Sequence, residues 1–246
     1  MLKVDIDNIT ISNNGNTHLL LENINFQLSE GKVYTILGKN GTGKSTLIKS
    51  LTKLLNENIF SVNGNIIWNN KNILDCSVDE LLKIRKDEIR YVFQDAANSF
   101  DPLKTFGYYF DNSRAGKNKI GELLDYFLLP HYDEISGLYS YEVSGGMAQR
   151  LSIILAFLAE PQLIILDEPT SGIDYAISNL LLLKLKKFTK EENKFVLIVT
   201  HDIIFAEKVS DELAFLSNET ITQFSTKDDF FAKQDIDLLN SIKEMK

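Results

Sequence analysis

The chain has 246 residues, 44 % of them hydrophobic, which is enough to bury the core of one large α/β domain or of a domain with a subdomain. Its formal net charge of −8 argues against nucleic acid as the main partner. The single cysteine, Cys76, excludes an intrachain disulfide and a cysteine metal cluster and fits a reducing cytoplasm. The longest apolar run, 153–159, is far shorter than the roughly 20 residues of a membrane span, and the acidic start of the chain does not fit a signal peptide.

The N-terminal part is predicted to hold antiparallel strands and then a strand, a loop and a helix. Apolar and polar residues alternate over 1–28, which predicts β structure, and the polar tract 12–18 is expected to be the loop within it. A turn at 29–31 leads into the apolar run 33–37, which predicts a strand. Apolar residues recur at helical period from 46 to 55, which predicts a helix.

The segment between that strand and that helix, Leu37 to Thr46, has the spacing of a Walker A phosphate-binding loop. Its glycines allow a tight turn whose N–H groups surround a polyphosphate. Lys44 is expected to contact the β- and γ-phosphates, and the Ser45 hydroxyl is expected to bind Mg²⁺. The loop alone leaves the class of nucleotide hydrolase open. The nucleotide-binding residues predicted here are Gly38, Asn40, Gly41, Gly43, Lys44, Ser45 and Thr46.

The middle of the chain changes from strand signals to helical ones. Two short β-prone stretches, 64–68 and 71–74, flank Asn69-Asn70 and predict a hairpin. From 95 to about 161 helical periods take over, and this segment is predicted to be a helical insertion. Loops are expected within it at 112–118 and 130–141.

The last third of the chain predicts a parallel βαβ unit. The all-apolar runs 163–166 and 195–199 are typical of strands buried on both faces of a parallel sheet. A leucine-rich helix is predicted between them, at 176–188, so a right-handed crossover is expected. Two further stretches, 213–216 and 221–224, predict a closing hairpin, and the tail 227–246 is predicted to be a polar helix.

Asp167 and Glu168 follow the buried run 163–166 directly, which is the pattern of a Walker B motif. Ligands bind at the carboxyl ends of strands in α/β sheets, so both acids are candidates for a site. Asp167 is expected to hold Mg²⁺ through water, and Glu168 is expected to act as the general base that orients and polarises the attacking water. The alternative is an ordinary strand followed by solvated acids.

A second candidate is the helix start at Ser144-Gly145-Gly146. Ser144 and the two glycines leave N-terminal N–H groups free to meet an anion. The alternative, a plain serine N-cap with a glycine turn, is the better interpretation for this segment alone. Its place about 20 residues before the Walker B motif favours function.

Together with the Walker A loop, these motifs resemble the ATP-binding-cassette (ABC) ATPases over nearly the whole chain. Three more segments match the family pattern: Gln94 after an apolar stretch, Ser171 to Asp174, and His201 after the run ending at Thr200. The resemblance implies an α/β fold with a P-loop NTPase (RecA-like) core and parallel sheet, an antiparallel β subdomain and a helical insertion subdomain. It implies one domain over 1–246, with the core and β subdomain in 1–94 and 161–246 and the helical subdomain at about 95–160.

The resemblance also implies roles for single residues. Gln94 is expected to contact Mg²⁺ and the attacking water, and His201 to reach the γ-phosphate of ATP. The signature residues Ser144, Gly145 and Gly146 are expected to touch ATP held by the opposite subunit, and the segment with Asp174 to cross the same interface. The same resemblance implies that the chain forms a dimer with an identical or homologous subunit. It also implies separate transmembrane permease subunits and a place on the cytoplasmic face of the cell membrane.

Three segments are similar to the peptide and nickel importer branch of the family: Phe93-Gln94-Asp95, the stretch 98–103, and 144–150. This similarity implies ATP hydrolysis that powers import of peptides, nickel or a metal chelate. The alternatives are a soluble ABC ATPase of iron–sulfur cluster assembly, a regulatory or mechanical ABC protein, and a simple P-loop kinase. The last does not explain the signature or His201.

The sequence departs from the family pattern at three places. Ala96 stands where the importer branch usually has proline, and Met147 is the fifth signature residue in place of glutamine. The tract 13–18, where the family carries an aromatic residue that stacks on adenine, contains none, and His18 is the substitute available. His18 and His131 are otherwise expected to be surface residues.

Overall fold

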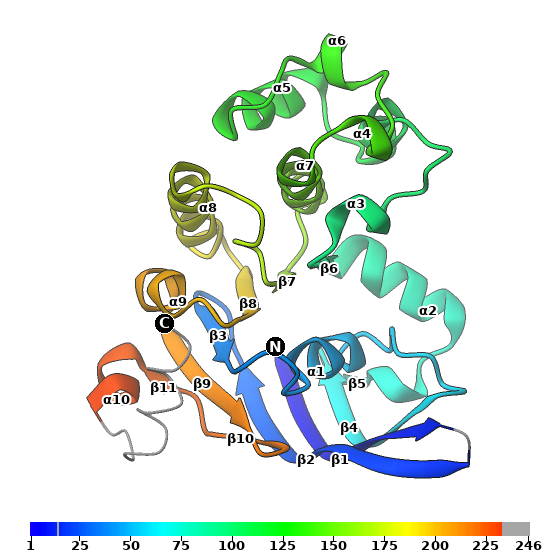
Figure 1. The fold of residues 1–246 in the computed structure, drawn as a ribbon, viewed down its shortest axis with the longest axis vertical. Helices are drawn as coiled ribbons and strands as arrows, with labels where there is room; N and C mark the ends of the chain where they lie inside the picture. The colour runs from blue at the N-terminus through cyan, green and yellow to red at the C-terminus, as the bar shows by residue number, and fades with distance from the viewer. Residues whose placement is uncertain (14, 233–246) are drawn as a thin grey trace.

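Two β-sheets and a group of helices make up the fold (Figure 1). The computed structural model describes residues 1–13 and 15–232. The larger sheet has the strand order β10-β9-β3-β8-β7-β6, with β11 paired to β9, and the smaller has the order β2-β1-β4-β5. The strands are β1 (Leu2–Asn13), β2 (Asn16–Leu28), β3 (Val33–Leu37), β4 (Phe60–Trp68), β5 (Lys71–Asn72), β6 (Ile89–Val92), β7 (Leu163–Asp167), β8 (Phe195–Thr200), β9 (Glu212–Ser217), β10 (Thr220–Ile221) and β11 (Ser225–Thr226).

Most of the helices lie between β6 and β7 or follow β7 in the chain. The helices α4, α5, α6 and α7 gather at one end of the molecule, at the top of the view in Figure 1. The α-helices are α1 (Lys44–Ser50), α2 (Val78–Lys83), α3 (Ala96–Ser99), α4 (Phe106–Asn112), α5 (Lys117–Tyr126), α6 (Tyr132–Ile135), α7 (Gly145–Leu158), α8 (Tyr175–Phe188), α9 (Ile203–Val209) and α10 (Lys227–Ala232). Short helical turns are η1 (Ile73–Asp75), η2 (Ile84–Glu88) and η3 (Ser140–Glu142).

The smaller sheet is antiparallel, as the alternation over 1–28 predicts. β1 pairs with β2 on one side and β4 on the other, and β4 with β5 forms the predicted hairpin. The expected loop at 12–18 is wrong, because pairing continues to Asn13 and Asn16 at the tip. Backbone hydrogen bonds extend the hairpin regardless of side-chain polarity. Ser12 and Thr17 add a hydroxyl contact of 3.3 Å across it.

The larger sheet has five parallel strands, β9, β3, β8, β7 and β6, which carry much of the hydrophobic core. β3, β7 and β8 are buried at every residue, as expected for strands covered on both faces. One face packs on α1 and the smaller sheet, and the other packs on α7, α8 and the neighbouring helices. The predicted β7–α8–β8 unit and the hairpin of β9 with β10 are confirmed. The predicted α/β class with one parallel and one antiparallel sheet is therefore confirmed.

The helix after the Walker A loop is shorter than predicted. α1 ends at Ser50, not at 55, because Lys53 has a φ of 53°, which does not continue a helix. The Arg85 guanidinium donates to the carbonyl oxygens of Thr52 and Lys53 at 2.6 to 2.9 Å. These carbonyl groups, just after the end of α1, thereby gain hydrogen-bond donors that the helix does not supply. Arg85 comes from η2, more than 30 residues further along the chain.

Two other helical segments were not expected. α2 begins with a capping box in which the Ser77 side chain accepts from Glu80 N and the Glu80 carboxylate accepts from Ser77 N. That pattern of serine followed three residues later by glutamate is a sequence signal for a helix start. α6 and η3 lie within 130–141, where a loop is expected. The predicted tail helix begins as α10, and residues 233–246 lie outside the described part of the chain.

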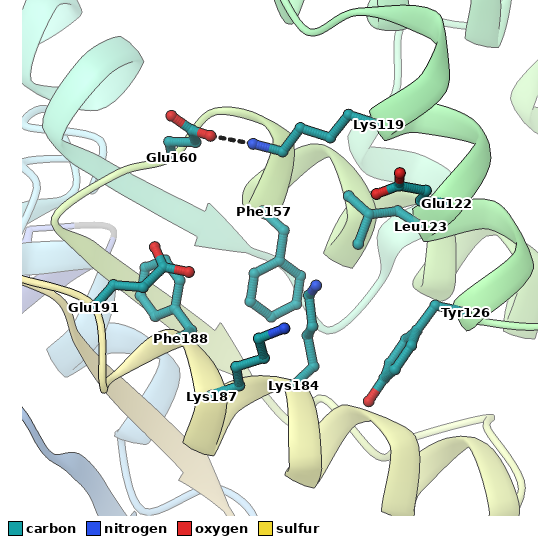
Figure 2. Close-up of a pocket in the computed structure, with 10 residues that line it drawn as sticks. All are labelled: Lys119, Glu122, Leu123, Tyr126, Phe157, Glu160, Lys184, Lys187, Phe188 and Glu191. Atoms are coloured by element: carbon teal, nitrogen blue, oxygen red, sulfur yellow. Dashed lines mark hydrogen bonds and ion pairs between the residues drawn. The ribbon is translucent and has the colours of Figure 1, made fainter.

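A cleft of about 240 Å³ separates α5 from α8 beside the end of α7 (Figure 2). The Lys184 ammonium lies over the Tyr126 and Phe157 rings, 5.3 and 5.7 Å from their centroids. An ion pair between Lys119 and Glu160 lies at its rim. Lysine stems that cover aromatic rings while the charge reaches water are a common packing arrangement. The residues that line this cleft come from α5, α8 and the end of α7, and none of them belongs to the Walker A loop.

Candidate active site

The carboxyl ends of four adjacent parallel strands meet at one edge of the larger sheet. Leu37 on β3 is level with Thr200 on β8, and Val199 is level with Asp167 on β7. Ligands bind outside this edge in α/β sheets. Four of the predicted site segments follow or end these strands: the Walker A loop after β3, Gln94 after β6, Asp167 and Glu168 at the end of β7, and His201 after β8.

The Walker A loop is shaped by two glycines with different requirements. A Cβ atom at Gly38 would stand 2.8 Å from the carbonyl oxygen of Leu216, so a larger residue would displace backbone. Gly43 has a φ of 94°, which L side chains rarely adopt, and it precedes α1 without a side-chain cap. The N–H groups of the first turn of α1, from Lys44 to Thr46, therefore have no acceptor within the helix. They point out of the helix end, where a phosphate group would sit.

Lys44 lies buried inside this loop. Its Nζ donates to the carbonyl oxygens of Gly38 and Lys39 at 2.8 and 2.9 Å. It also lies 3.4 Å from Glu168 Oε1, and both side chains are 5 % exposed. Burial lowers the pKa of the Lys44 ammonium, and the negative charges of Glu168 and Asp167 counter part of that shift. The lysine thus joins the Walker A loop to the Walker B acids.

Glu168 is held by the end of β8. Its Oε2 accepts a hydrogen bond of 2.8 Å from the Thr200 hydroxyl and one of 3.2 Å from the His201 N–H, and it lies 3.0 Å from His201 Nδ1. The backbone φ of Glu168 is 46°, a left-handed conformation that is strained for a non-glycine residue. Its Oε1 is buried and accepts no hydrogen bond of good geometry from the described residues. This oxygen has capacity left for a further donor, such as a water.

Asp167 is held at both oxygens. Ser45 Oγ donates to Oδ1 and Tyr91 Oη donates to Oδ2, each at 3.0 Å. Burial raises the pKa of the Asp167 carboxyl, while the two hydrogen bonds lower it. A cavity of about 400 Å³ opens beside these groups. Its lining residues are Ser45, Lys49, Phe93, Gln94, Asp95, Asn98, Ser99 and Asp167.

The structure therefore brings together most of the predicted residues but leaves one set apart. Ser144 caps α7 by accepting from Met147 N at 3.3 Å, and Asp174 caps α8 by accepting from Ile177 N at 2.9 Å. α7 and α8 lie well away from α1 in Figure 1. Gly146 packs against the carbonyl of Gly172, so a Cβ there would be 2.7 Å from that oxygen. The signature and the Ser171–Asp174 segment thus form one surface, in which Ser144, Gly145 and Asp174 are exposed.

Two residues at the site are not singled out by the motifs. Tyr91 belongs to an apolar stretch in the sequence, yet its hydroxyl reaches Asp167. Thr200 is the last residue of an apolar strand, yet its hydroxyl reaches Glu168. In both residues the sequence signal is a hydroxyl group near the carboxyl end of a strand. A buried hydroxyl donor needs a hydrogen-bond partner, and the acids of the site are the acceptors at that edge. His18 and His131 are exposed, as expected.

The composition of the site fits nucleotide and magnesium chemistry. Within residues 1–13 and 15–232, no group of three or more His, Cys, Asp or Glu side chains could hold a metal ion. A hydroxyl and a carboxylate oxygen, Ser45 Oγ and Asp167 Oδ1, lie next to each other instead. Magnesium in proteins takes few protein oxygens and completes its shell with phosphate and water. The residues present therefore fit a magnesium ion bound together with a nucleotide.

Comparison with known proteins decides the family. A family model described as ABC transporter matches residues 21–171, which is more than half of the chain. The chain belongs to this family. It is an ABC ATPase, and ABC ATPases hydrolyse ATP with Mg²⁺ as the usual ion. The predicted family, fold class and enzyme class are confirmed.

Similar proteins include ATP-binding subunits of import and transport systems. The metal-staphylopine import system ATP-binding protein CntD of Staphylococcus aureus is 29 % identical over 93 % of this ABC ATPase and 87 % of its own length. The dipeptide transport ATP-binding protein DppD of Bacillus subtilis is 27 % identical, covering 94 % and 72 %. The oligopeptide transport ATP-binding protein OppD of Haemophilus influenzae is 29 % identical, covering 86 % and 68 %.

Solved structures agree with the fold. A dimeric ATP-binding cassette in a post-hydrolysis state with ADP and Pi superimposes with a TM-score of 0.77 at 26 % identity, covering 92 % of this chain and 99 % of the other. The cbiO1 protein of Clostridium perfringens, part of an ABC transporter complex, gives a TM-score of 0.73 at 26 % identity, covering 94 % and 90 %. Among the residues that the structure describes, no helix is long and apolar enough to span a bilayer.

Proposed function

We propose that this ABC ATPase is the ATP-hydrolysing subunit of a membrane importer that takes up peptides, nickel or a metal chelate. The observation that carries the proposal is the convergence of Lys44, Asp167, Glu168 and His201 at one sheet edge, with an exposed signature surface elsewhere on the chain. The import and transport proteins similar to this chain support the choice of cargo classes. They disfavour the alternative role in iron–sulfur cluster assembly.

In this proposal the Walker A loop binds the polyphosphate of ATP. The backbone around Gly38, Asn40, Gly41 and Gly43, with the N–H groups from Lys44 to Thr46, surrounds the phosphates. The Lys44 ammonium exchanges its contact with Glu168 for the β- and γ-phosphates, where its charge stabilises the transferred group. Ser45, Asp167 and Gln94 would hold Mg²⁺, which neutralises phosphate charge when bound.

Glu168 then acts as the general base. Its buried oxygen Oε1 takes a proton from a water molecule as the water oxygen forms a bond to the γ-phosphorus and the bond to the leaving oxygen of ADP breaks. Thr200 and His201 hold the other carboxylate oxygen, so that the base is fixed in orientation before the water arrives. Gln94, which lines the cavity, would position the water, and the His201 ring would reach the γ-phosphate.

The second half of the site comes from a partner subunit in this proposal. Ser144, Gly145 and Gly146 would close over ATP held by the other subunit, and Asp174 would cross the interface beside them. Ser144 and Gly145 are exposed, which supports such a role. Dimeric solved cassettes are similar to this chain over 92 % of its length. The partner is an identical or a homologous subunit.

We propose that the permease binds the helical subdomain, at about 95–160. This subdomain makes one ABC ATPase domain together with the core and β subdomain in 1–94 and 161–246. Leu103 is 81 % exposed and Tyr108 is 46 % exposed in the segment after Gln94. We propose that the permease binds at these two exposed apolar side chains. The separate transmembrane permease subunits would place this chain on the cytoplasmic face of the cell membrane.

Co-purification from detergent-solubilised membranes tests this proposal. The tagged full chain should bring down integral membrane proteins, and the complex should hydrolyse ATP. Leu103→Asp should lose the membrane partners and keep ATP binding, whereas Leu183→Asp, at an exposed leucine of α8, should keep both. Recovery of soluble iron–sulfur assembly proteins without any membrane protein would contradict the importer role.

A further inference from the structure

Tyr91 is a partly buried tyrosine on β6, the strand at one edge of the larger sheet. It is level with Ile165 on the neighbouring strand β7, and Asp167 stands two residues further along β7 on the same face of the sheet. The Tyr91 hydroxyl donates a 3.0 Å hydrogen bond to Asp167 Oδ2. The Tyr91 ring packs on Phe93, with ring centroids 4.4 Å apart. The ring is thereby fixed, and the hydroxyl points at the carboxylate.

The other oxygen of Asp167 faces the nucleotide side. Ser45 Oγ donates to Oδ1 at 3.0 Å, so one oxygen meets the Walker A helix and the other meets Tyr91. A carboxylate held at one oxygen alone can rotate about its side-chain bond, whereas two donors on opposite oxygens fix its plane. Asp167 is therefore oriented before any nucleotide binds.

We propose that Tyr91 is a positioning residue that holds the Asp167 carboxylate in the orientation that binds the nucleotide-associated divalent cation. This inference rests on the proposed role of Ser45 and Asp167. Groups that hydrogen-bond to a metal ligand orient it and strengthen the site, and their removal typically weakens metal affinity or activity by about 10- to 100-fold. Gln94, which lines the cavity, lies two residues after the end of β6, so this strand and the loop that follows it carry both Tyr91 and Gln94.

Tyr91→Phe is the direct test, because it removes the hydroxyl and keeps the ring on Phe93. The affinity of the full chain for Mn²⁺ is measured by electron paramagnetic resonance in the presence of the ATP analogue AMP-PNP. We expect about tenfold weaker Mn²⁺ binding in the variant. The affinity for AMP-PNP in EDTA should be unchanged, because the loop contacts to phosphate do not involve Tyr91. A merely structural loss would weaken both.

Tyr126→Phe is a matched control. The Tyr126 hydroxyl is partly buried and donates to the carbonyl of Leu180 at 2.9 Å in the cleft of Figure 2, away from the Walker A loop. This variant should bind Mn²⁺ as the wild-type chain does. In an Asp167→Asn background, Tyr91→Phe should cause no further loss, because the two residues act through one contact.

Two results would overturn the assignment of Tyr91 alone: wild-type Mn²⁺ affinity in Tyr91→Phe, or the same loss with and without Asp167. A wild-type chain that takes up no Mn²⁺ with AMP-PNP would instead overturn the proposed metal site itself. The two failures are thus distinguishable.

Discussion

Replacing Glu168 by glutamine separates nucleotide binding from hydrolysis. Glutamine keeps the shape of the side chain and an oxygen that can accept from the Thr200 hydroxyl at 2.8 Å, but it cannot take a proton from water. Loss of a general base lowers a rate by about 10²- to 10⁴-fold. This corresponds to about 3–5 kcal/mol in the activation barrier, at about 1.36 kcal/mol for each factor of ten.

The binding of ATP should survive the same change. Lys44 keeps its hydrogen bonds to the carbonyl oxygens of Gly38 and Lys39, at 2.8 and 2.9 Å, and loses only the longer 3.4 Å contact to Glu168. The lysine is then released from a competing negative charge, so ATP affinity should be equal to or several-fold above that of the wild-type chain. Because the variant keeps the ATP that the signature of a second subunit would close over in the proposed mechanism, it should accumulate an ATP-bound dimer.

Phosphate release, ATP binding and size-exclusion chromatography measure the three effects. Glu122→Gln is the control, because it neutralises an exposed carboxylate on α5 and should change none of them. Undiminished phosphate release by Glu168→Gln would falsify the assignment of the base. Loss of ATP binding together with hydrolysis would show that Glu168 supports the shape of the loop.

Three other substitutions test the remaining parts of the site. Lys44→Ala should weaken ATP binding by about 10- to 100-fold in calorimetry, as expected for a charged hydrogen-bond donor, and unchanged binding would contradict the Walker A assignment. Ser144→Arg should abolish hydrolysis and ATP-dependent dimer formation while the monomer still binds ATP. Normal turnover in this variant would mean that the signature residues do not complete the ATPase site. Gly38→Ala should destabilise the fold by about 1–3 kcal/mol in thermal unfolding, because its Cβ would meet the Leu216 carbonyl at 2.8 Å. Gly121→Ala in α5, where no atom lies within 4 Å of a Cβ, should be neutral or stabilising, and equal effects at both glycines would refute the steric argument.

The order of the elements and most of the site could be predicted because they depend on local patterns. A buried parallel strand is an apolar run whatever surrounds it, and the loops after Leu37 and Asp167 must lie at the carboxyl edge of the sheet. That is why Lys44 and Glu168, which are far apart in the sequence, could be assigned to one site, whereas His201 was assigned through the resemblance to the ABC ATPases. The 3.0 Å contact of His201 with Glu168 joins the ends of the adjacent strands β8 and β7, and the 3.4 Å contact of Lys44 with Glu168 reaches across the end of β8, which lies between β3 and β7.

Tertiary contacts account for what could not be predicted. α1 ends early where Arg85, from a distant turn, binds the carbonyl groups of Thr52 and Lys53. The hairpin of β1 and β2 continues through polar residues because its hydrogen bonds belong to the backbone. Tyr91 looks like one more apolar residue of a strand, and its role depends on the register that brings it beside Asp167. Such partners are set by the fold and leave little trace in a local pattern.

The central claim is that each chain carries half of an ATPase site that a second subunit completes. Specific activity measured with Mg²⁺-ATP over a wide range of protein concentration tests this most directly. The account predicts that phosphate release per chain rises steeply with concentration and levels off once the dimer forms, and that Ser144→Arg stays inactive throughout. A specific activity that is constant down to concentrations at which the chain is monomeric would contradict it.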